Sequence, residues 1–175
     1  MTPAESITRL ITSLFSCLFF LFLATPAMGN DNRFIKLDAA GQELPRDAQQ
    51  WIMVKDTKTK LTWEVKTDDD SIHDKDSRFT WKQTQEEFIA TLNKEKFGGF
   101  SDWRMPNETD IATIRIKKGE PPYTDTHFFP NTVPDKYWFF YICGDGTFMT
   151  NKQNFGKGKT RGNKYFARAV RGEEL

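Results

Sequence analysis

The clearest alternation of apolar and polar positions lies between Trp51 and Lys66, in the stretch WIMVKDTKTKLTWEVK. Two segments rich in β-branched and aromatic residues flank the polar stretch DTKTK, which is the composition of a β-hairpin with a polar turn. On the returning strand Leu61, Trp63 and Val65 share one face, because successive side chains point to opposite sides of a strand. The pattern therefore predicts two antiparallel strands at the start of an ordered domain.

The spacing of apolar positions then changes to that of a helix. Thr80 and Gln83 have the T-x-x-Q spacing of a capping box, in which the two side chains satisfy backbone N–H groups at a helix start. We expect this helix to continue to about Lys94. Its apolar residues fall on one face, and they are Trp81, Phe88, Ile89 and Leu92.

A second helix start follows the stretch GGFSDWRMP. Pro106 ends the extended segment, Asn107 is a favourable N-cap, and Asp110 suits the positive end of a helix. We expect the helix to run to about Lys118, because Gly119 and the two prolines after it cannot continue a helix. The paired glycines before the motif supply backbone angles or a close approach that a side chain would block.

The C-terminal third contains three candidate strands. They are Tyr137 to Cys143, Thr147 to Thr150, and Tyr165 to Arg171. The sequence GDG between the first two is typical of a tight hairpin turn. At the other end, residues 30–50 are polar with single scattered apolar residues, and we interpret them as an irregular lead-in to the domain.

Residues 1–29 have the pattern of a signal peptide. A basic residue precedes the apolar run LITSLFSCLFFLFLA, and the following TPAMG places small residues where a signal peptidase cuts. The run is shorter than the roughly 20 residues that a bilayer span needs. We therefore expect an exported protein, periplasmic or extracellular, with no membrane span after cleavage and with Cys143 as its single, buried cysteine.

Several motifs in order resemble the Lcl C-terminal domain family: the MVKDTKTKLTWEV hairpin, the FTW helix start, FGGFSDWRMPNETDI, FFPN, YW and the closing ARAVRG. The resemblance covers residues 51–172. That family is similar to the wider C-type-lectin-like and sulfatase-modifying-factor fold. The resemblance implies an α+β domain with two helices packed beside short antiparallel strands, in which the DWRMP element is scaffold.

The scaffold interpretation assigns a role to five residues: Trp63, Trp81, Trp103, Arg104 and Pro106. The three tryptophans should be buried and close together, because exposed they would form a large apolar patch. Arg104 should pair with a carboxylate or with helix-end carbonyls. Pro106 should fix the turn.

An acidic stretch separates the hairpin from the first helix. Its candidate calcium ligands are Asp68, Asp70, Asp74 and Asp76, since carboxylate oxygens are the ligands that Ca²⁺ prefers. The stretch does not have the EF-hand pattern, because Ile72 occupies a ligand position and no glycine stands at the sharp turn. A solvated acidic loop and a calcium site therefore both remain open.

The charge of the chain is divided unevenly. The mature chain of 146 residues would carry 24 basic and 23 acidic residues, yet residues 146–172 contain seven cations and no anion. Such a segment attracts polyanions, and nearby aromatic rings can stack on sugars. The candidate glycan-binding residues are Lys157, Lys159, Arg161, Lys164, Trp138 and Tyr141. The alternative is that the lysines only keep a sheet edge soluble and the aromatic residues belong to the core.

The sequence contains no convincing catalytic constellation. GFSDW is not a G-x-S-x-G elbow, His73 and His127 have no partner at metal-ligand spacing, and one mature cysteine cannot supply a catalytic pair. We therefore expect an exported, non-catalytic domain that binds an anionic glycan or another surface component. The alternative is a structural or protein-interaction module of an envelope complex. No nucleic-acid partner is expected.

Overall fold

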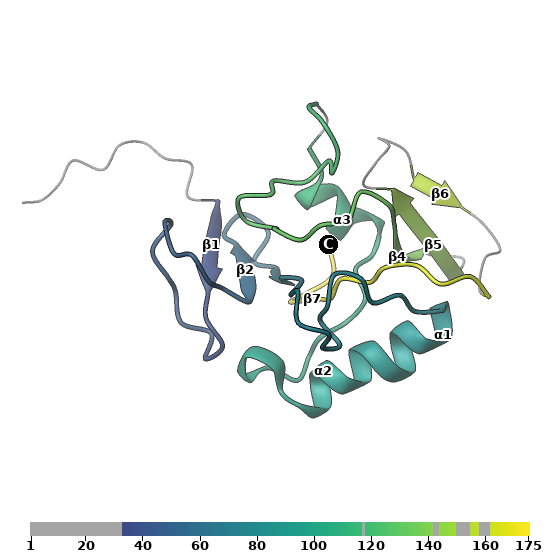
Figure 1. Ribbon diagram of the computed structural model, residues 1–175, viewed down its shortest axis with the longest axis horizontal. Helices are drawn as coiled ribbons and strands as arrows, with labels where there is room; N and C mark the ends of the chain where they lie inside the picture. The colour runs from purple at the N-terminus through teal and green to yellow at the C-terminus, as the bar shows by residue number, and fades with distance from the viewer. Residues whose placement is uncertain (1–32, 117, 142–143, 150–154, 158–161) are drawn as a thin grey trace, which may run out of the picture. The chain divides into compact units, whose positions relative to one another are not determined.

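The computed structural model describes residues 33–175, except for 117, 142–143, 150–154 and 158–161, and for the strand positions between 141 and 157 it describes the backbone. In this part of the chain the strands form two antiparallel sheets (Figure 1). The first has the order β1 (Phe34–Leu37), β2 (Met53–Asp56), β3 (Thr62–Glu64), β7 (Val170–Arg171). The second has the order β4 (Lys136–Tyr141), β5 (Gly144–Met149), β6 (Phe155–Lys157).

The expectation of an irregular segment at residues 30–50 is wrong for its first part. Strand β1 lies in this segment and pairs with β2, with Phe34 opposite Asp56. An ion pair of 2.6 Å between Arg33 and the buried Asp56 links the start of β1 to the end of β2. β1 was missed because it has four residues and sits at a sheet edge, where packing against a neighbour decides the conformation more than local pattern does.

The predicted hairpin is confirmed as strands β2 and β3, with Val54 opposite Trp63. Both faces of the sheet are covered, because Met53 and Val54 point to opposite sides of β2 and are both fully buried. This differs from the one-sided burial that an alternating strand usually has.

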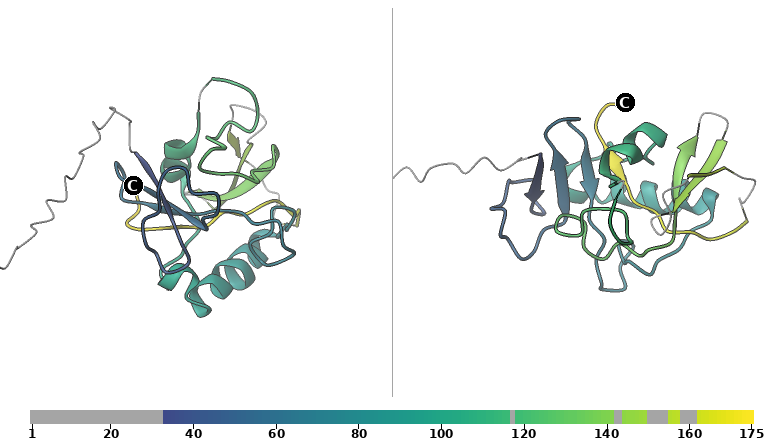
Figure 2. Two further views of the ribbon diagram at one scale, coloured as in Figure 1. Left: turned by 60° about the vertical axis from the view of Figure 1, so that its left-hand side comes forward. Right: turned by 90° about the horizontal axis from the view of Figure 1, so that it is seen from above.

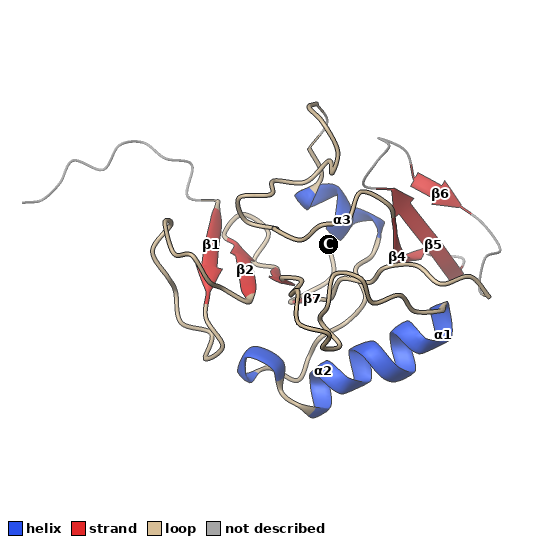
Figure 3. Ribbon diagram, viewed as in Figure 1, coloured by secondary structure: helices blue, strands red, loops and turns tan. Residues whose placement is uncertain are grey.

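The first predicted helix is confirmed from Trp81 to Lys94, with the capping box of Thr80 and Gln83. It consists of α1 (Trp81–Gln83), the π-helical turn η1 (Thr84–Ile89) and α2 (Ala90–Lys94), which follow one another without a break (Figure 3). A short 3₁₀ turn, η2 (Phe97–Gly99), follows.

The second helix, α3 (Glu108–Ile114), has Asn107 as its N-cap and a reciprocal bond from Asp110. It ends at Ile114 and not near Lys118, because Arg115 is extended and forms a bridge with Thr124. α3 lies between the two sheets in both Figure 1 and Figure 2. Its buried Ile111 and Ile114 pack with core residues of both sheets, among them Trp63 of β3 and Tyr137 of β4.

Three details of the C-terminal third differ from expectation, and the first is strand β6 at Phe155–Lys157, where no strand was expected. Gly144 pairs with Tyr141, so the residues GDG belong to strand β5 and are not the hairpin turn. In the expected strand from Tyr165 to Arg171 only Val170 and Arg171 form strand β7, while Tyr165 makes an isolated bridge with Phe79. The expected leader and Cys143 lie outside the described residues.

The three tryptophans of the scaffold prediction are all buried, but each lies in a different apolar cluster. Trp63 packs with Val54, Ile111 and other residues between the sheets. Trp103 lies with residues of β2 and the long helix, and Trp81 lies with Met105 and Trp138. The helix from Trp81 to Lys94 thus contacts both sheets. Within the described residues, the helices are too short or too polar to span a bilayer.

Candidate functional site

The basic segment, defined here as residues 152–164, includes strand β6 at the edge of the second sheet. Lys157 belongs to β6 and pairs with Gly146 of β5. Lys164 follows the segment's last turn and is exposed. Lys159 and Arg161, like the side chains of Lys157 and Tyr141, lie outside what the structure describes. The topology therefore places the backbone of Lys157 at one sheet edge.

Trp138 is not available to a glycan. Its side chain is 1% exposed, and its indole Nε1 donates a 2.7 Å hydrogen bond to the carbonyl of Phe79. Trp81 and Tyr165 pack edge-on against the ring. Residues two apart on a strand share a face, so Trp138 lies on the same side of β4 as Phe140, but the long helix covers it. The glycan-stacking prediction for Trp138 is wrong.

Two cations C-terminal to the basic segment, Arg168 and Arg171, contribute to the structure of the fold itself. Arg171 makes hydrogen bonds of 2.7 and 3.1 Å to Asp102 and lies 3.7 Å from the ring centre of Phe100. The hydrogen bonds from Arg171 hold the pKa of Asp102 below its usual value. Arg168 is 3% exposed. The remaining cations of the C-terminal run all lie in residues 152–164 of the sequence.

The acidic loop is organised by its own hydrogen bonds. The carboxylate of Asp74 accepts backbone N–H bonds from Asp69, Asp70 and Asp76 at 2.7–3.0 Å. These bonds, first among them the one from Asp76, lower the pKa of Asp74. Asp68 and Asp76 both contact the ammonium of Lys75, and these contacts raise the pKa of that lysine. The carboxylate oxygens of Asp74 are thus turned into the loop.

The four candidate calcium ligands are near one another in sequence but do not assemble into one site. Among the described residues, no group of three or more His, Cys, Asp or Glu side chains is arranged to hold a metal ion. Asp70 adopts a left-handed backbone conformation, with φ of 58°, in the turn that Asp74 caps. The loop is an acidic turn that is held by hydrogen bonds among its own residues.

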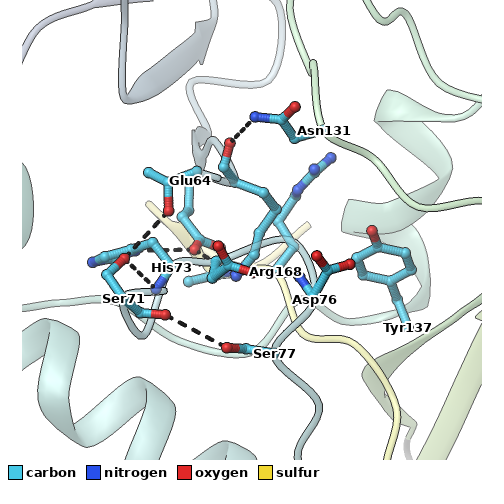
Figure 4. A network of polar contacts seen from close by, with 12 residues as sticks. Glu64, Ser71, His73, Asp76, Ser77, Asn131, Tyr137 and Arg168 are labelled. Atoms are coloured by element: carbon cyan, nitrogen blue, oxygen red, sulfur yellow. Dashed lines mark hydrogen bonds and ion pairs between the residues drawn. The ribbon is translucent and has the colours of Figure 1, made fainter. Parts of the chain in front are cut away.

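A cluster of ionisable side chains, which the sequence did not suggest, joins this loop to the core (Figure 4). Glu64 is fully buried, and its Oε1 is 3.0 Å from both Lys66 Nζ and His73 Nδ1. Its Oε2 accepts a 3.1 Å bond from the backbone N–H of Ala169. Burial alone would raise the pKa of Glu64, but Lys66 and then His73 bring it below its usual value. The carboxylate is therefore charged and paired.

Arg168 completes the buried charge cluster, defined as Glu64, Lys66, His73 and Arg168. Its guanidinium donates a 3.0 Å bond to Thr132 and lies against the rings of Phe129 and Tyr137. Its Nε is buried without a hydrogen-bond partner in the described part of the chain. Burial also raises the pKa of the Tyr137 phenol. The cluster is packed on all sides and holds β3, the acidic loop and the chain before β7 together.

The DWRMP element is packed and hydrogen-bonded within the fold. Arg104 Nη1 donates a 2.6 Å bond to Asp110, and the guanidinium also reaches the carbonyls of Gly172 and Glu173. The indole of Trp103 donates to the carbonyl of Phe97 at 2.9 Å. The buried Pro106 accepts a 2.7 Å bond from the N–H of Phe140. The element joins α3, β4 and the C-terminal residues.

One groove adjoins this element. It has a volume of about 290 Å³, and its lining residues come from the long helix, the DWRMP element, β4 and the C-terminus: Gln85, Ile89, Trp103, Arg104, Met105, Phe140 and Glu174. Phe140 is 47% exposed. Its ring lies 6.3 Å from that of Trp81, at an interplanar angle of 23°.

The model of the Lcl C-terminal domain family matches residues 52–171. No curated protein and no solved structure matches the chain, so the likeness to C-type-lectin-like folds stays a prediction. The match spans the hairpin, both helices, the DWRMP element and strand β7. The chain therefore belongs to the Lcl C-terminal domain family.

Proposed function

We propose that this chain is an exported, non-catalytic binding domain and that its ligand is an anionic glycan held by the basic segment. Its family is associated with secreted proteins. The pattern of residues 1–29 agrees with export. These two observations support the compartment, and the charge distribution supports the ligand.

The observation that carries the proposal is the separation of charge along the chain. The segment from residue 152 to 164 contains five cations and no anion, and they are Lys152, Lys157, Lys159, Arg161 and Lys164. The neighbouring Arg168 and Arg171 already have partners inside the fold. Elsewhere cations such as Lys75 and Arg78 lie beside carboxylates. The basic segment is thus suited to a polyanion that comes from outside the molecule.

The chemistry of the segment predicts weak, salt-dependent binding. Attraction between exposed charges fades over a Debye length of about 8 Å at physiological ionic strength. The segment also contains Gly156, Gly158 and Gly162, which allow many backbone conformations. Each long side chain that becomes fixed costs about 0.5–1.5 kcal/mol. We therefore expect tolerance of different sulfated or carboxylated polysaccharides.

The test is retention of residues 30–175 on a heparin column. Ser replaces Lys157, Lys159, Arg161 and Lys164 in one variant, and the matched control carries Ser at the exposed lysines 58, 82, 94 and 118. Both variants lose four positive charges. The native domain and the control should elute at similar salt concentrations, and the segment variant should elute earlier.

Retention that falls equally in both variants would show that net charge alone is responsible. If the native domain and the folded segment variant elute together at low salt, the glycan proposal is wrong. The protein-interaction module of an envelope complex would then be the better hypothesis.

A further inference from the structure

Phe140 differs from the other aromatic residues of the domain. Among the residues whose side chains the structure describes, it is the one Phe, Tyr or Trp that is exposed, although it follows the buried Phe139 on β4. One side of its ring is supported by Trp81. Its backbone is fixed by the hydrogen bond to Pro106 and the bridge to Asn107. The ring is therefore a rigid apolar surface at the wall of a groove.

The floor and rim of the groove differ in chemistry. The floor is apolar, because Ile89 and Met105 belong to the cluster that Trp81 and Trp138 form. The rim carries an amide, Gln85, and a carboxylate, Glu174, and both are exposed. Neither side chain has an interaction with another residue in the described part of the chain. Arg104 is held by Asp110 and two carbonyls, so it forms a fixed wall.

We propose that this groove binds the apolar face of an uncharged sugar ring, as a second site that is separate from the basic segment. A pyranose has a face of C–H groups that packs on an aromatic ring, and its hydroxyl groups lie around the edge. The amide of Gln85 can both donate to and accept from hydroxyls, and Glu174 accepts. The volume of about 290 Å³ is at the lower end of ligand pockets, which suits one ring.

The hydrogen bonds of β4 argue against an extended peptide as the occupant. Peptides often bind by adding a strand to a free sheet edge. Here the N–H of Trp138 donates to Phe166 and that of Phe140 donates to Pro106, so this edge of β4 is already paired. A sugar needs no such edge.

The charges near the groove argue for a neutral ring. Glu174 lies on the rim, and the guanidinium of Arg104 is neutralised by Asp110. A sulfate or uronate at this position would meet a like charge without a free cation among the described lining residues. Binding here should consequently be insensitive to salt, in contrast to binding at the basic segment.

The test is titration of the domain with three neutral tetrasaccharides, of cellulose, maltose and chitin type, at 0.15 and about 1 M NaCl. Tryptophan fluorescence is the readout, because Trp103 lines the groove and Trp81 supports Phe140. At least one sugar should give a saturable change that is equal at both salt concentrations. Phe140→Ala should weaken it at least about tenfold, and Phe140→Trp should retain it because indole offers the larger face.

Ile116→Ala is the matched control, since Ile116 is exposed to 39% and does not line the groove. It should bind like the native domain, while Gln85→Ala should bind severalfold more weakly. The proposal is overturned if no tetrasaccharide binds, or if a folded Phe140→Ala variant binds as tightly as the native domain. Binding that disappears at high salt and follows the basic-segment variant would also overturn it, while supporting the proposed function.

Discussion

The buried charge cluster and the basic segment both concentrate charged residues, yet they differ in whether the protein itself supplies the partners. In the cluster, one carboxylate, Glu64, meets Lys66 and His73 at 3.0 Å and a backbone N–H at 3.1 Å. In the basic segment, five cations occur without an anion between them. Glu64 thus has its polar partners within the fold, whereas the sequence places no anion among the cations of the basic segment.

The difference shows that a cation's position in the fold decides whether it pairs inside the protein. Its sign and the local density of charge do not decide this. Arg168 and Arg171 continue the cationic run in sequence, but one enters the core and the other pairs with Asp102. A buried pair contributes little net stability but is costly to break. An exposed, unpaired cation is nearly neutral for folding. Mutations in the buried charge cluster should therefore change stability, and mutations in the basic segment should change ligand binding.

The largest effect is expected for Glu64→Gln. The change removes the negative charge from a site where Lys66 is 1% exposed, and it leaves that ammonium buried without a counter-charge. We expect a loss of about 3–5 kcal/mol in the free energy of unfolding, measured by urea denaturation at pH 7.

The double variant Glu64→Gln, Lys66→Met is the control. Because it removes both charges of the pair, it should recover much of the lost stability. If Glu64→Gln changes the unfolding free energy by less than about 1 kcal/mol, the pairing that we assign to the cluster does not stabilise the fold.

The second prediction concerns pH. The pKa of Glu64 is lowered in the folded state, and so are those of Asp56 and Asp102. A lowered pKa contributes stability above the unfolded value, about 4.3 for Glu, and the contribution is lost as pH falls through the folded value. The unfolding free energy should be flat between about pH 5 and 7 and fall below about pH 4.3.

Glu64→Gln should make that acid decline shallower, since one of the responsible groups is gone. The remaining slope belongs to the aspartates. Equal slopes in the native domain and the variant, from urea midpoints at successive pH values, would show that Glu64 takes no part in acid unfolding.

A smaller effect is expected to distinguish Arg171 from Lys164, two cations of the same C-terminal run. Arg171→Ser removes a two-bond ion pair and a contact with Phe100, and we expect a loss of about 1 kcal/mol without a change in heparin elution. Lys164→Ser should do the reverse, leaving stability unchanged and lowering the elution salt. The comparison between regions fails if both variants lose heparin retention to the same extent.

The smallest effect on stability is expected for the variant with Ser at Lys157, Lys159, Arg161 and Lys164. Its unfolding free energy should stay within about 0.5 kcal/mol of the native value, as for surface substitutions without partners. Thermal unfolding by circular dichroism measures this. A loss above about 2 kcal/mol would place these residues in the folded core and remove them from the proposed ligand site.

Local signals in the sequence predicted much of the helical structure. The capping box of Thr80 and the N-cap at Asn107 depend on side chains close to each helix start, so both are visible in the sequence and both form. Strand β1 has no such signal, since its pairing with β2 is a contact between segments about 20 residues apart. The early end of α3 likewise depends on the bridge between Arg115 and Thr124.

The candidate sites were harder to predict because burial is decided by distant segments. Trp138 and Phe140 are equivalent in the β4 pattern, but Trp81 and Tyr165 enclose the first and leave the second exposed. Glu64 and Lys66 alternate with apolar residues as solvent-facing residues do. The second face of their sheet is nevertheless covered, so their charges are internal.

The burial of Lys36 and Lys66 has a consequence for experiments that use amine chemistry. Lys36 is 2% exposed, with its ammonium 2.8 Å from the carbonyl of Ala48 and 3.6 Å from the ring centre of Trp51. Acylating reagents should therefore spare these two amines and modify exposed ones such as Lys164. Coupling the domain to a biosensor through its lysines would consume the positive charge of the proposed ligand site while the fold stayed intact, so a terminal tag is the suitable point of attachment.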